Sequence, residues 1–237
     1  MKAIVDAPVR PVAPATWGGR RAGAGRKPKA AKDRTFVPHH ARPVHKKRHP
    51  THVTVRARKG LPSFRSERVH AMVRRILENQ TRRRYRDDFQ VVQYSIQSNH
   101  LHLIVEATDT RTMRAGVSGL VIAFAKRLNA LLSRLTGKVW GDRYHARDLR
   151  TPSEVRNALV YLLQNYKKHG YTTYGPVVDP LSSALYFDGW ARPVATDADA
   201  SPLPRRPPRT WLLGGGWTRA RGGLLSPGER PARPGAG

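Results

Sequence analysis

Two histidines separated by one residue are the part of this sequence best suited to chemistry. His100 and His102 lie in the run Ser-Asn-His-Leu-His-Leu-Ile-Val-Glu, residues 98–106. Its apolar, β-branched character predicts a strand, on which alternate side chains share a face. The two imidazoles would project the same way as Ile104, and neutral imidazoles held side by side can share one divalent cation. The alternative is a pair of histidines on a half-wetted sheet face.

A second candidate lies on a helix predicted from Thr151-Pro152-Ser153-Glu154, with Ser153 as its cap, to about Lys168. Tyr161 falls about 120° from the apolar stripe of this helix, and Asn165 lies one turn beyond Tyr161. Tyr161 is therefore a presented group. The residues predicted to form the buried stripe are Val155, Ala158, Leu159, Leu162 and Tyr166.

Together these residues indicate phosphodiester chemistry. A tyrosine can attack a phosphodiester, but its ordinary pKa near ~10 leaves little phenolate at neutral pH. A cation held by His100, His102 and Asn165 could bind and polarise the scissile phosphate. The product would be a 5′-phosphotyrosine and a free 3′-hydroxyl, and no nucleotide cofactor would be required.

The elements that must position these groups alternate between strands and helices. Two strands, at 89–97 and 98–106, are joined so closely that we expect them to be antiparallel neighbours. Val92, Tyr94 and Ile96 are expected to share one face of the first of these. The other predicted elements are strands at 52–57 and 139–150 and helices at 66–84 and 112–135.

The composition favours a polyanionic partner. Lys and Arg number 44 against 16 Asp and Glu, a formal net charge of +28, which draws the protein toward nucleic acid. No apolar run approaches the ~20 residues that span a bilayer. The chain has no cysteine, which excludes disulfides and thiolate metal sites. We expect a cytoplasmic, nucleoid-associated protein.

Both ends of the chain have the composition of disordered segments. Residues 1–50 carry thirteen Lys and Arg against Asp6 and Asp33, and residues 191–237 are rich in Pro, Gly and Arg. Arg26 and Lys27 could enter a minor groove or contact phosphates. Trp211 and Trp217 are either exposed, stacked on bases or docked on the domain. We interpret four histidines as part of the basic arm: His39, His40, His45 and His49.

Further candidates for DNA binding lie between the tails. Lys126 and Arg127 occupy the polar face of the helix predicted at 112–135. The strand predicted at 139–150 has a basic, aromatic character. Its candidate DNA-binding residues are Trp140, Arg143, Tyr144 and Arg147.

In this order the motifs resemble those of the single-tyrosine insertion-sequence transposases, specifically the REP-associated tyrosine transposases of the His-hydrophobic-His (HUH) nuclease class. The run from Ser98 to Ile104 matches the family's Pro-Asn-His-x-His-Leu-Ile, and Tyr161 to Asn165 matches Tyr-x-x-x-Asn-Pro. The family's Trp-x-x-Arg-Tyr is matched by Trp140, Arg143 and Tyr144, and His52-Val53-Thr54 resembles its first strand. The resemblance covers about residues 52–170.

The resemblance implies a fold of α+β class, a ferredoxin-like antiparallel sheet with helices on one face, at 51–190 between disordered basic tails. It implies Mg²⁺ or Mn²⁺ on His100 and His102, with Tyr161 as nucleophile and Asn165 as third ligand. The expected partner is single-stranded or hairpin DNA, bound by a monomer or homodimer. The chain departs from the pattern at Ser98 and Tyr166, where relatives have proline.

Two other functions are compatible with the sequence. The first is a nucleic-acid-binding protein on the same scaffold whose catalysis has lapsed. Intact His100, His102 and Tyr161 argue against such decay. The second, a basic ribosome-associated protein, explains the charge but not the order of the motifs.

Overall fold

The computed structural model describes residues 42–82, 87–134, 137–169, 178–194 and 206–230. The chain divides into two units, Met1–Phe36 and Val37–Gly237, and every described residue belongs to the second. Arg26, Lys27 and most of both predicted tails lie outside the described residues. None of the described helices is long and apolar enough to cross a membrane.

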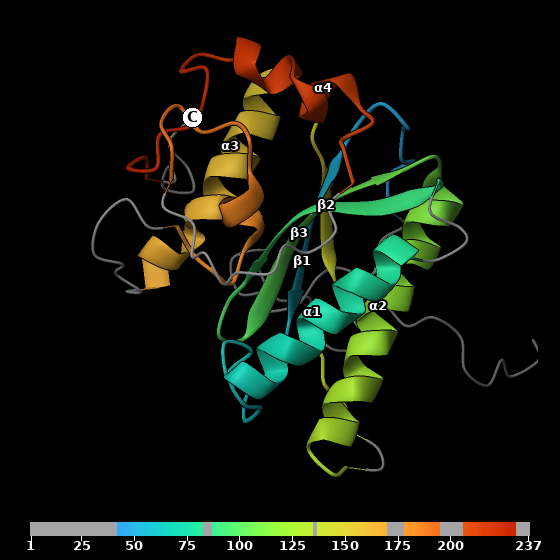
Figure 1. Cartoon of the computed structure of the whole chain (residues 1–237). Coiled ribbons are helices and arrows are strands. Elements are labelled where there is room, and N and C mark those ends of the chain that lie inside the picture. Colours follow the sequence, from blue (N-terminus) through green and yellow to red (C-terminus); the bar gives the residue numbers. More distant parts are fainter. Residues whose placement is uncertain (1–41, 83–86, 135–136, 170–177, 195–205, 231–237) are drawn as a thin grey trace, which may run out of the picture. The chain divides into compact units, whose positions relative to one another are not determined.

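Four antiparallel strands form the central sheet (Figure 1). They are β1 (Thr51–Arg56), β2 (Phe89–Ile96), β3 (His100–Ala107) and β4 (His145–Asp148). Their order is β2-β3-β1-β4, so β2 and β3 pair as the predicted antiparallel neighbours. The α+β class is confirmed, whereas the strand predicted at 139–150 is reduced to the four residues of β4.

Two helices cover one face of the sheet, α1 (Glu67–Arg82) and α2 (Thr110–Leu131). Their apolar stripes pack on the side chains of β1 and β3 that point away from the histidines. The shared core includes Val53, Val55, Leu101, Leu103, Val105, Val73, Ile76, Val117, Leu120 and Phe124. This layer is the one that the helical and strand periodicities predict.

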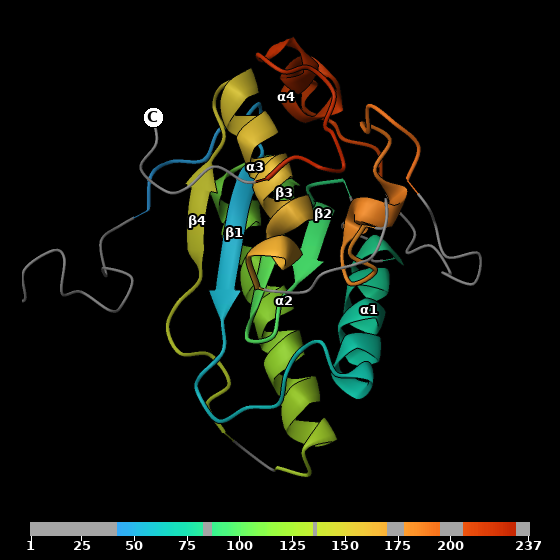
Figure 2. The same ribbon diagram turned by 90° about the vertical axis from the view of Figure 1, so that its left-hand side faces the viewer.

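The third helix lies on the other face. It comprises α3 (Pro152–Gln164) and a short 3₁₀ turn, η2 (Asn165–His169), and Figure 2 shows it in front of the sheet. The expectation of helices on one face therefore describes α1 and α2 only. The cap of α3 is Thr151 and not Ser153, because the Thr151 hydroxyl accepts a hydrogen bond from the Glu154 amide.

A bulge in β2 changes the alternation expected for Val92, Tyr94 and Ile96. The register with β3 shifts between Val91 and Gln93, so one extra residue lies in β2 and its side-chain pattern is displaced. Val92 packs with the α3 layer, whereas Tyr94 and Ile96 pack with α1 and α2. Sequence alternation alone does not disclose an inserted residue.

The prediction of disorder over 191–237 is wrong for residues 206–230. This stretch forms α4 (Trp211–Gly214) and the 3₁₀ turn η4 (Gly216–Arg219), and it packs beside α3 in both ribbon views. Leu212, Leu213, Trp217 and Leu225 are buried with the α3 core. A few large apolar side chains in a Pro- and Gly-rich sequence suffice because the domain supplies the surface that they cover.

The predicted basic arm also ends earlier than residue 50. Residues 42–50 are described, and His45 and His49 are buried. His45 Nε2 lies 3.0 Å from the Ala107 carbonyl oxygen, and its Nδ1 lies 3.2 Å from Asp148 Oδ1. The interpretation of these two histidines as arm residues is therefore wrong, since His45 fastens the segment to β3 and β4.

Candidate active site

The predicted histidine strand and the predicted tyrosine helix come together. His100 and His102 point with Ile104 into the α3 layer, as the strand alternation requires. Their ring centroids lie 4.7 Å apart, and the Tyr161 ring stands edge-on to His102 at 5.1 Å. Tyr161 is partly exposed, whereas Tyr166 is buried. We call the face of the sheet that carries His100 and His102 the histidine face.

His100 is oriented by its neighbour in the chain. Its Nδ1 lies 2.8 Å from the side-chain oxygen of Asn99. An amide oxygen can only accept a hydrogen bond, so Nδ1 carries the proton and Nε2 carries the lone pair. A neutral imidazole whose outer nitrogen donates to a fixed acceptor is the usual form of a histidine that ligates a metal.

His102 is oriented by two residues of β1. Its Nδ1 lies 3.2 Å from His52 Nε2 and 3.1 Å from Thr54 Oγ1. Burial lowers the pKa of His52 to about 4, and the charges of His145 and Arg147 add to this effect. His52 is therefore neutral at pH 7, and its Nε2 can accept a hydrogen bond from His102 Nδ1–H. That arrangement leaves the lone pair of His102 on Nε2.

The environment of Tyr161 does not by itself favour the phenolate. Burial raises the pKa of Tyr161, and the positive charge of Arg56 opposes that rise without cancelling it. The ring also lies 5.9 Å from that of His52. Tyr161 therefore lies beside the neutral imidazole of His52 and one nearby cation, and further positive charge would be needed to ionise it.

Asn165 and Gln164 differ in their surroundings. Asn165 closes the C-terminal end of α3 and is 1% exposed, and its side-chain nitrogen has no hydrogen-bond partner within the described part of the chain. Gln164 is fully buried and donates from Nε2 to the Ser226 carbonyl oxygen. Gln164 thus holds the C-terminal segment against α3.

The donor chemistry of His100 and His102 fits a divalent cation. The contact with Asn99 leaves the lone pair of His100 on Nε2, and a hydrogen bond from His102 Nδ1–H to His52 leaves that of His102 on Nε2. No group of three or more His, Asp or Glu side chains in the described ranges forms a metal-binding cluster. The described residues would therefore supply two imidazoles, and a third ligand among them would be of another type, such as the amide of Asn165.

A row of basic side chains crosses the histidine face. Residues that pair directly across antiparallel strands point to the same side of the sheet. Arg56 pairs with His100, and Thr54 pairs with both His102 and His145. Arg147 pairs with His52 in the same way. The row of Arg56, His145 and Arg147 therefore runs from the histidine pair to the outer edge of the sheet.

The other predicted DNA-binding residues are scattered. The Trp140 indole donates to the Val121 carbonyl and packs against Phe124, so it belongs to the α2 layer. Lys126 and Arg127 are exposed on α2, the helix on the opposite face from Tyr161. Arg143 and Tyr144 precede β4 and are partly exposed, and Arg147 forms an ion pair with Glu154.

Sequence reasoning missed His52 and Arg56 as members of the site. Both lie on β1, and only the register of β1 against β3 places them beside His102 and His100. The available signal was the alternation of His52, Thr54 and Arg56 along a predicted strand. That alternation puts the three polar side chains on one face, although it does not say which strand they meet.

Comparison with known proteins finds solved structures of low similarity, among them the following two. No protein-family model and no curated protein sequence matches the chain. A REP-associated tyrosine transposase bound to a REP hairpin has 18% sequence identity and a TM-score of 0.48, over 62% of this chain and 82% of that chain. A provisionally named transposase from Deinococcus radiodurans R1 has 15% identity and a TM-score of 0.36, over 52% and 92%. Both scores are low, so functional assignment rests on the residues of the site.

Proposed function

We propose that the chain is a single-tyrosine transposase of the HUH class, which cleaves and rejoins single-stranded DNA at hairpin or palindromic sites. The observation that carries this proposal is the Tyr161 ring 5.1 Å from the ring of His102, itself 4.7 Å from that of His100. The motifs that resemble this family thus converge on one face, with the nucleophile on a different element from the histidine pair.

In the proposed reaction the phenolic oxygen of Tyr161 attacks the scissile phosphorus. A bond forms between that oxygen and the 5′-phosphate, and the bond from phosphorus to the 3′-oxygen breaks. The phenol loses its proton, and the departing 3′-oxygen takes one up. The bond energy is kept in the phosphotyrosine, so the reverse attack by a 3′-hydroxyl rejoins a strand.

The roles of the surrounding residues follow from their contacts. Mg²⁺ or Mn²⁺ bound by His100 and His102, with Asn165 as the proposed third ligand, would polarise the phosphate. His52 and Thr54 would keep His102 in the ligating tautomer. Arg56 would favour the phenolate of Tyr161 and attract the DNA backbone.

The test is covalent capture of DNA. Purified protein with Mn²⁺ and a labelled hairpin that carries single-stranded flanks is expected to form an adduct stable to denaturing electrophoresis. Tyr161→Phe removes the nucleophilic oxygen, so it should abolish the adduct and retain DNA binding. Tyr186→Phe, which removes a phenol from η3 (Ser183–Tyr186), is the matched control.

The same experiment separates the alternative function. An undiminished adduct with Tyr161→Phe would overturn the assignment of the nucleophile. DNA binding without an adduct under any metal condition, and with unchanged affinity after His100 and His102 are replaced by alanine, would instead identify a catalytically lapsed binding protein.

A further inference from the structure

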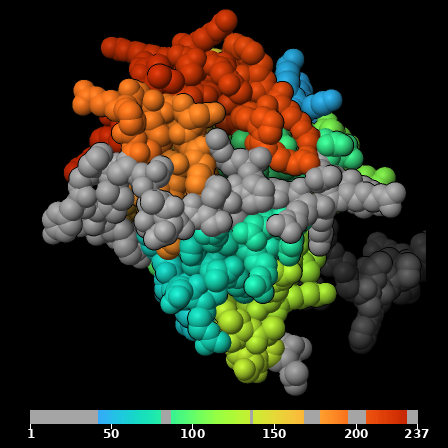
Figure 3. Space-filling view, viewed as in Figure 1, coloured from blue at the N-terminus to red at the C-terminus, as the bar shows by residue number. Residues whose placement is uncertain are grey.

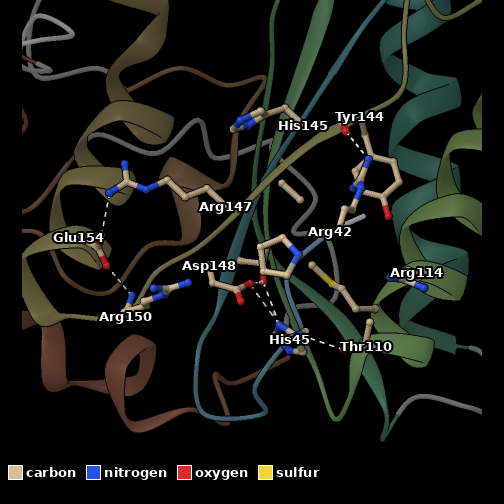
Figure 4. Close-up of a pocket in the computed structure, with 14 residues that line it drawn as sticks. Arg42, His45, Thr110, Arg114, Tyr144, His145, Arg147, Asp148, Arg150 and Glu154 are labelled. Atoms are coloured by element: carbon tan, nitrogen blue, oxygen red, sulfur yellow. Dashed lines mark hydrogen bonds and ion pairs between the residues drawn. The ribbon is translucent and has the colours of Figure 1, made fainter. Parts of the chain in front are cut away.

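A cavity of about 370 Å³ lies at the edge of the sheet beside β4. Four parts of the chain line it: the segment that contains Arg42 and His45, Thr51 of β1, the start of α2, and the stretch from Tyr144 to Glu154. Its volume is within the range of about 300–1,000 Å³ typical of small-molecule pockets. Figure 4 shows the labelled side chains arranged on both sides of β4. We call this cavity the β4-edge pocket.

The two carboxylates of the pocket are already engaged. Asp148 accepts from Thr51 Oγ1 at 2.7 Å and contacts His45 Nδ1. Glu154 accepts from Arg147 and from the Arg150 amide, at 2.7 and 2.6 Å. These contacts appear as dashed lines in Figure 4. The carboxylates therefore neutralise their own partners and leave other cations of the pocket uncompensated.

Arg42, Arg114 and the exposed side chain of Arg150 are those cations. The Arg42 guanidinium lies 3.5 Å from the centroid of the Tyr144 ring and donates from Nη2 to the Tyr144 carbonyl. Its Nη1 is buried and has no hydrogen-bond partner in the described ranges. Arg114 is exposed on the first turns of α2, where no described residue forms an ion pair with it. Burial lowers the pKa of Arg42, and the charges of Arg143 and Arg114 lower it further.

Part of the remaining lining is apolar. Pro43, Met113, Ala146 and the ring of Tyr144 contribute to it. A site that combines three uncompensated guanidinium groups with apolar surface suits a group that has a phosphate at one end and a sugar or base at the other. A simple inorganic anion would leave the apolar part of the cavity unused.

The position of the pocket connects it with the candidate active site. His145 and Arg147 belong both to its lining and to the basic row on the histidine face. Two strand spacings of about 4.8 Å separate β4 from β3, a distance that a few nucleotides of an extended strand can cross. Among the described strands, β4 pairs only with β1, so no described strand covers its outer edge.

We propose that the β4-edge pocket binds one nucleotide of the single-stranded DNA that flanks the cleavage site, with its phosphate on Arg42 and Arg114. The inference rests on the proposed function for the identity of the partner. It adds a second point of recognition, which fixes the position of the strand relative to Tyr161.

The experiment measures DNA binding in the Tyr161→Phe background, so that no cleavage occurs. Three labelled hairpins of the same stem are compared: one blunt, one with an eight-nucleotide 5′ extension and one with an eight-nucleotide 3′ extension. Arg114→Gln is the principal variant, because an exposed side chain without described partners can be replaced without disturbing the fold. Arg42→Gln is the second variant, and Arg75→Gln, an exposed arginine of α1, is the matched control.

Arg114→Gln and Arg42→Gln are each expected to weaken binding of one extended hairpin about tenfold and to leave the blunt hairpin within about twofold. Arg75→Gln should affect all three hairpins equally and by less. Equal losses on blunt and extended hairpins would show general phosphate attraction and overturn the proposal, as would no loss at all. Saturable binding of thymidine 5′-monophosphate alone, unaffected by DNA, would point to a free nucleotide as the ligand and would also overturn it.

A second measurement locates the bound nucleotide. 2-Aminopurine placed at successive positions of the extension should change its fluorescence most at one position, and Arg114→Gln should remove that maximum. The adduct assay with unaltered Tyr161 tests the proposed chemistry independently. An adduct with no extension-dependent effect of Arg114→Gln would refute the pocket alone, whereas the reverse pattern would refute the chemistry alone.

Discussion

At the residue scale, the candidate site depends on which nitrogen of each histidine holds a proton. Asn99 settles this for His100, because its side-chain oxygen accepts from Nδ1. For His102 the partners are His52 and Thr54, both on β1. The His-x-His spacing predicted the pair but not these partners, because they become neighbours only through pairing of strands that are far apart in the sequence.

His52 is therefore expected to control metal affinity without ligating. His52→Ala removes one of the two groups that contact His102 Nδ1 and leaves only the Thr54 hydroxyl, so the His102 ring should populate both tautomers and Mn²⁺ should bind about 10–100-fold more weakly. Titration calorimetry measures the affinity, and ¹⁵N chemical shifts of the imidazole nitrogens report the tautomer. His70→Ala on α1 is the matched control. Unchanged affinity together with an unchanged His102 tautomer would show that His52 only fills space.

A second prediction at this scale concerns His45. The hydrogen bond to Asp148, opposed by burial and supported by the Ala107 carbonyl, raises the pKa of His45 above 6.5. Burial raises the pKa of Asp148, but hydrogen bonds from His45 and Thr51 outweigh this effect and lower that pKa below 3.8. The stabilising contribution of His45 is thus complete below pH 6.5 and is lost as the pH rises through its raised pKa. The stabilising contribution of Asp148 is lost as the pH falls through the lowered pKa of Asp148.

His45→Gln should consequently destabilise the fold most near pH 5–6, by about 2 kcal/mol for a hydrogen bond between charged groups. The difference between variant and unaltered protein should shrink as the pH rises through the raised pKa of His45, because His45 then becomes neutral in the folded as well as the unfolded chain. Thermal unfolding across this pH range measures the effect. A difference in melting temperature that is independent of pH would contradict a charged His45.

At the element scale, periodicity predicted the helices and most of the sheet. The apolar stripes of α1, α2 and α3 and the faces of β1 and β3 lie where the sequence indicates, because each repeats over many residues. The sequence-based predictions are wrong where a local feature interrupts the regular spacing of apolar residues. These local features include the bulge at Val92, the short β4 strand and the cap at Thr151, which forms the Thr-x-x-Glu start signal with Glu154.

The C-terminal segment is the element that the sequence least discloses. Its Pro- and Gly-rich composition predicts disorder, yet it is held at several separate points. Arg156 donates to the Glu229 carboxylate at 2.7 and 2.9 Å, and Lys167 donates to the Pro227 carbonyl. Because Arg156, Gln164 and Lys167 come from α3 and η2, the segment stabilises the helix that carries Tyr161.

Glu106 at the end of β3 is expected to be the main anchor of this segment. It is 3% exposed and accepts from Gln90, from the amides of Arg209 and Thr210, and from the Thr210 hydroxyl. Glu106→Gln places an amino group among these donors, so it should lower the free energy of unfolding by about 3 kcal/mol.

Limited proteolysis of the Glu106→Gln variant should cleave first within residues 206–230, and chemical denaturation measures the stability. Glu67→Gln, at the exposed start of α1, is the control. Uniform resistance to protease in both variants would show that the segment is held by its apolar side chains alone.

At the scale of the whole molecule, the net charge of +28 is spread unevenly. Residues 1–41 contribute nine Lys and Arg against Asp6 and Asp33. The folded unit adds the basic row of Arg56, His145 and Arg147 and the β4-edge pocket. The charge predicted a nucleic-acid partner from composition alone. Composition does not show that this charge divides between a tail and a row on the histidine face. The register of β1 with β3 and β4 shows that row.

The boundary of the basic arm determines how its role should be tested. Deletion of residues 1–50 would also remove His45 and His49, which are buried, so it would alter the fold as well as the charge. Deletion of residues 1–41 leaves the described segment intact. If the arm contacts DNA phosphates, this deletion should flatten the dependence of log affinity on log salt concentration, by at most about 0.7 for each cation that contacts single-stranded DNA.

Fluorescence anisotropy with one extended hairpin at several salt concentrations measures this slope. Arg114→Gln in the full-length protein provides the comparison, because loss of one phosphate contact should change the slope by less than 1. The deletion should change it several-fold more, since it removes nine cations, and adduct formation by Tyr161 at low salt should persist. An unchanged slope after deletion would place the phosphate contacts within the folded unit and leave the arm without a part in DNA binding.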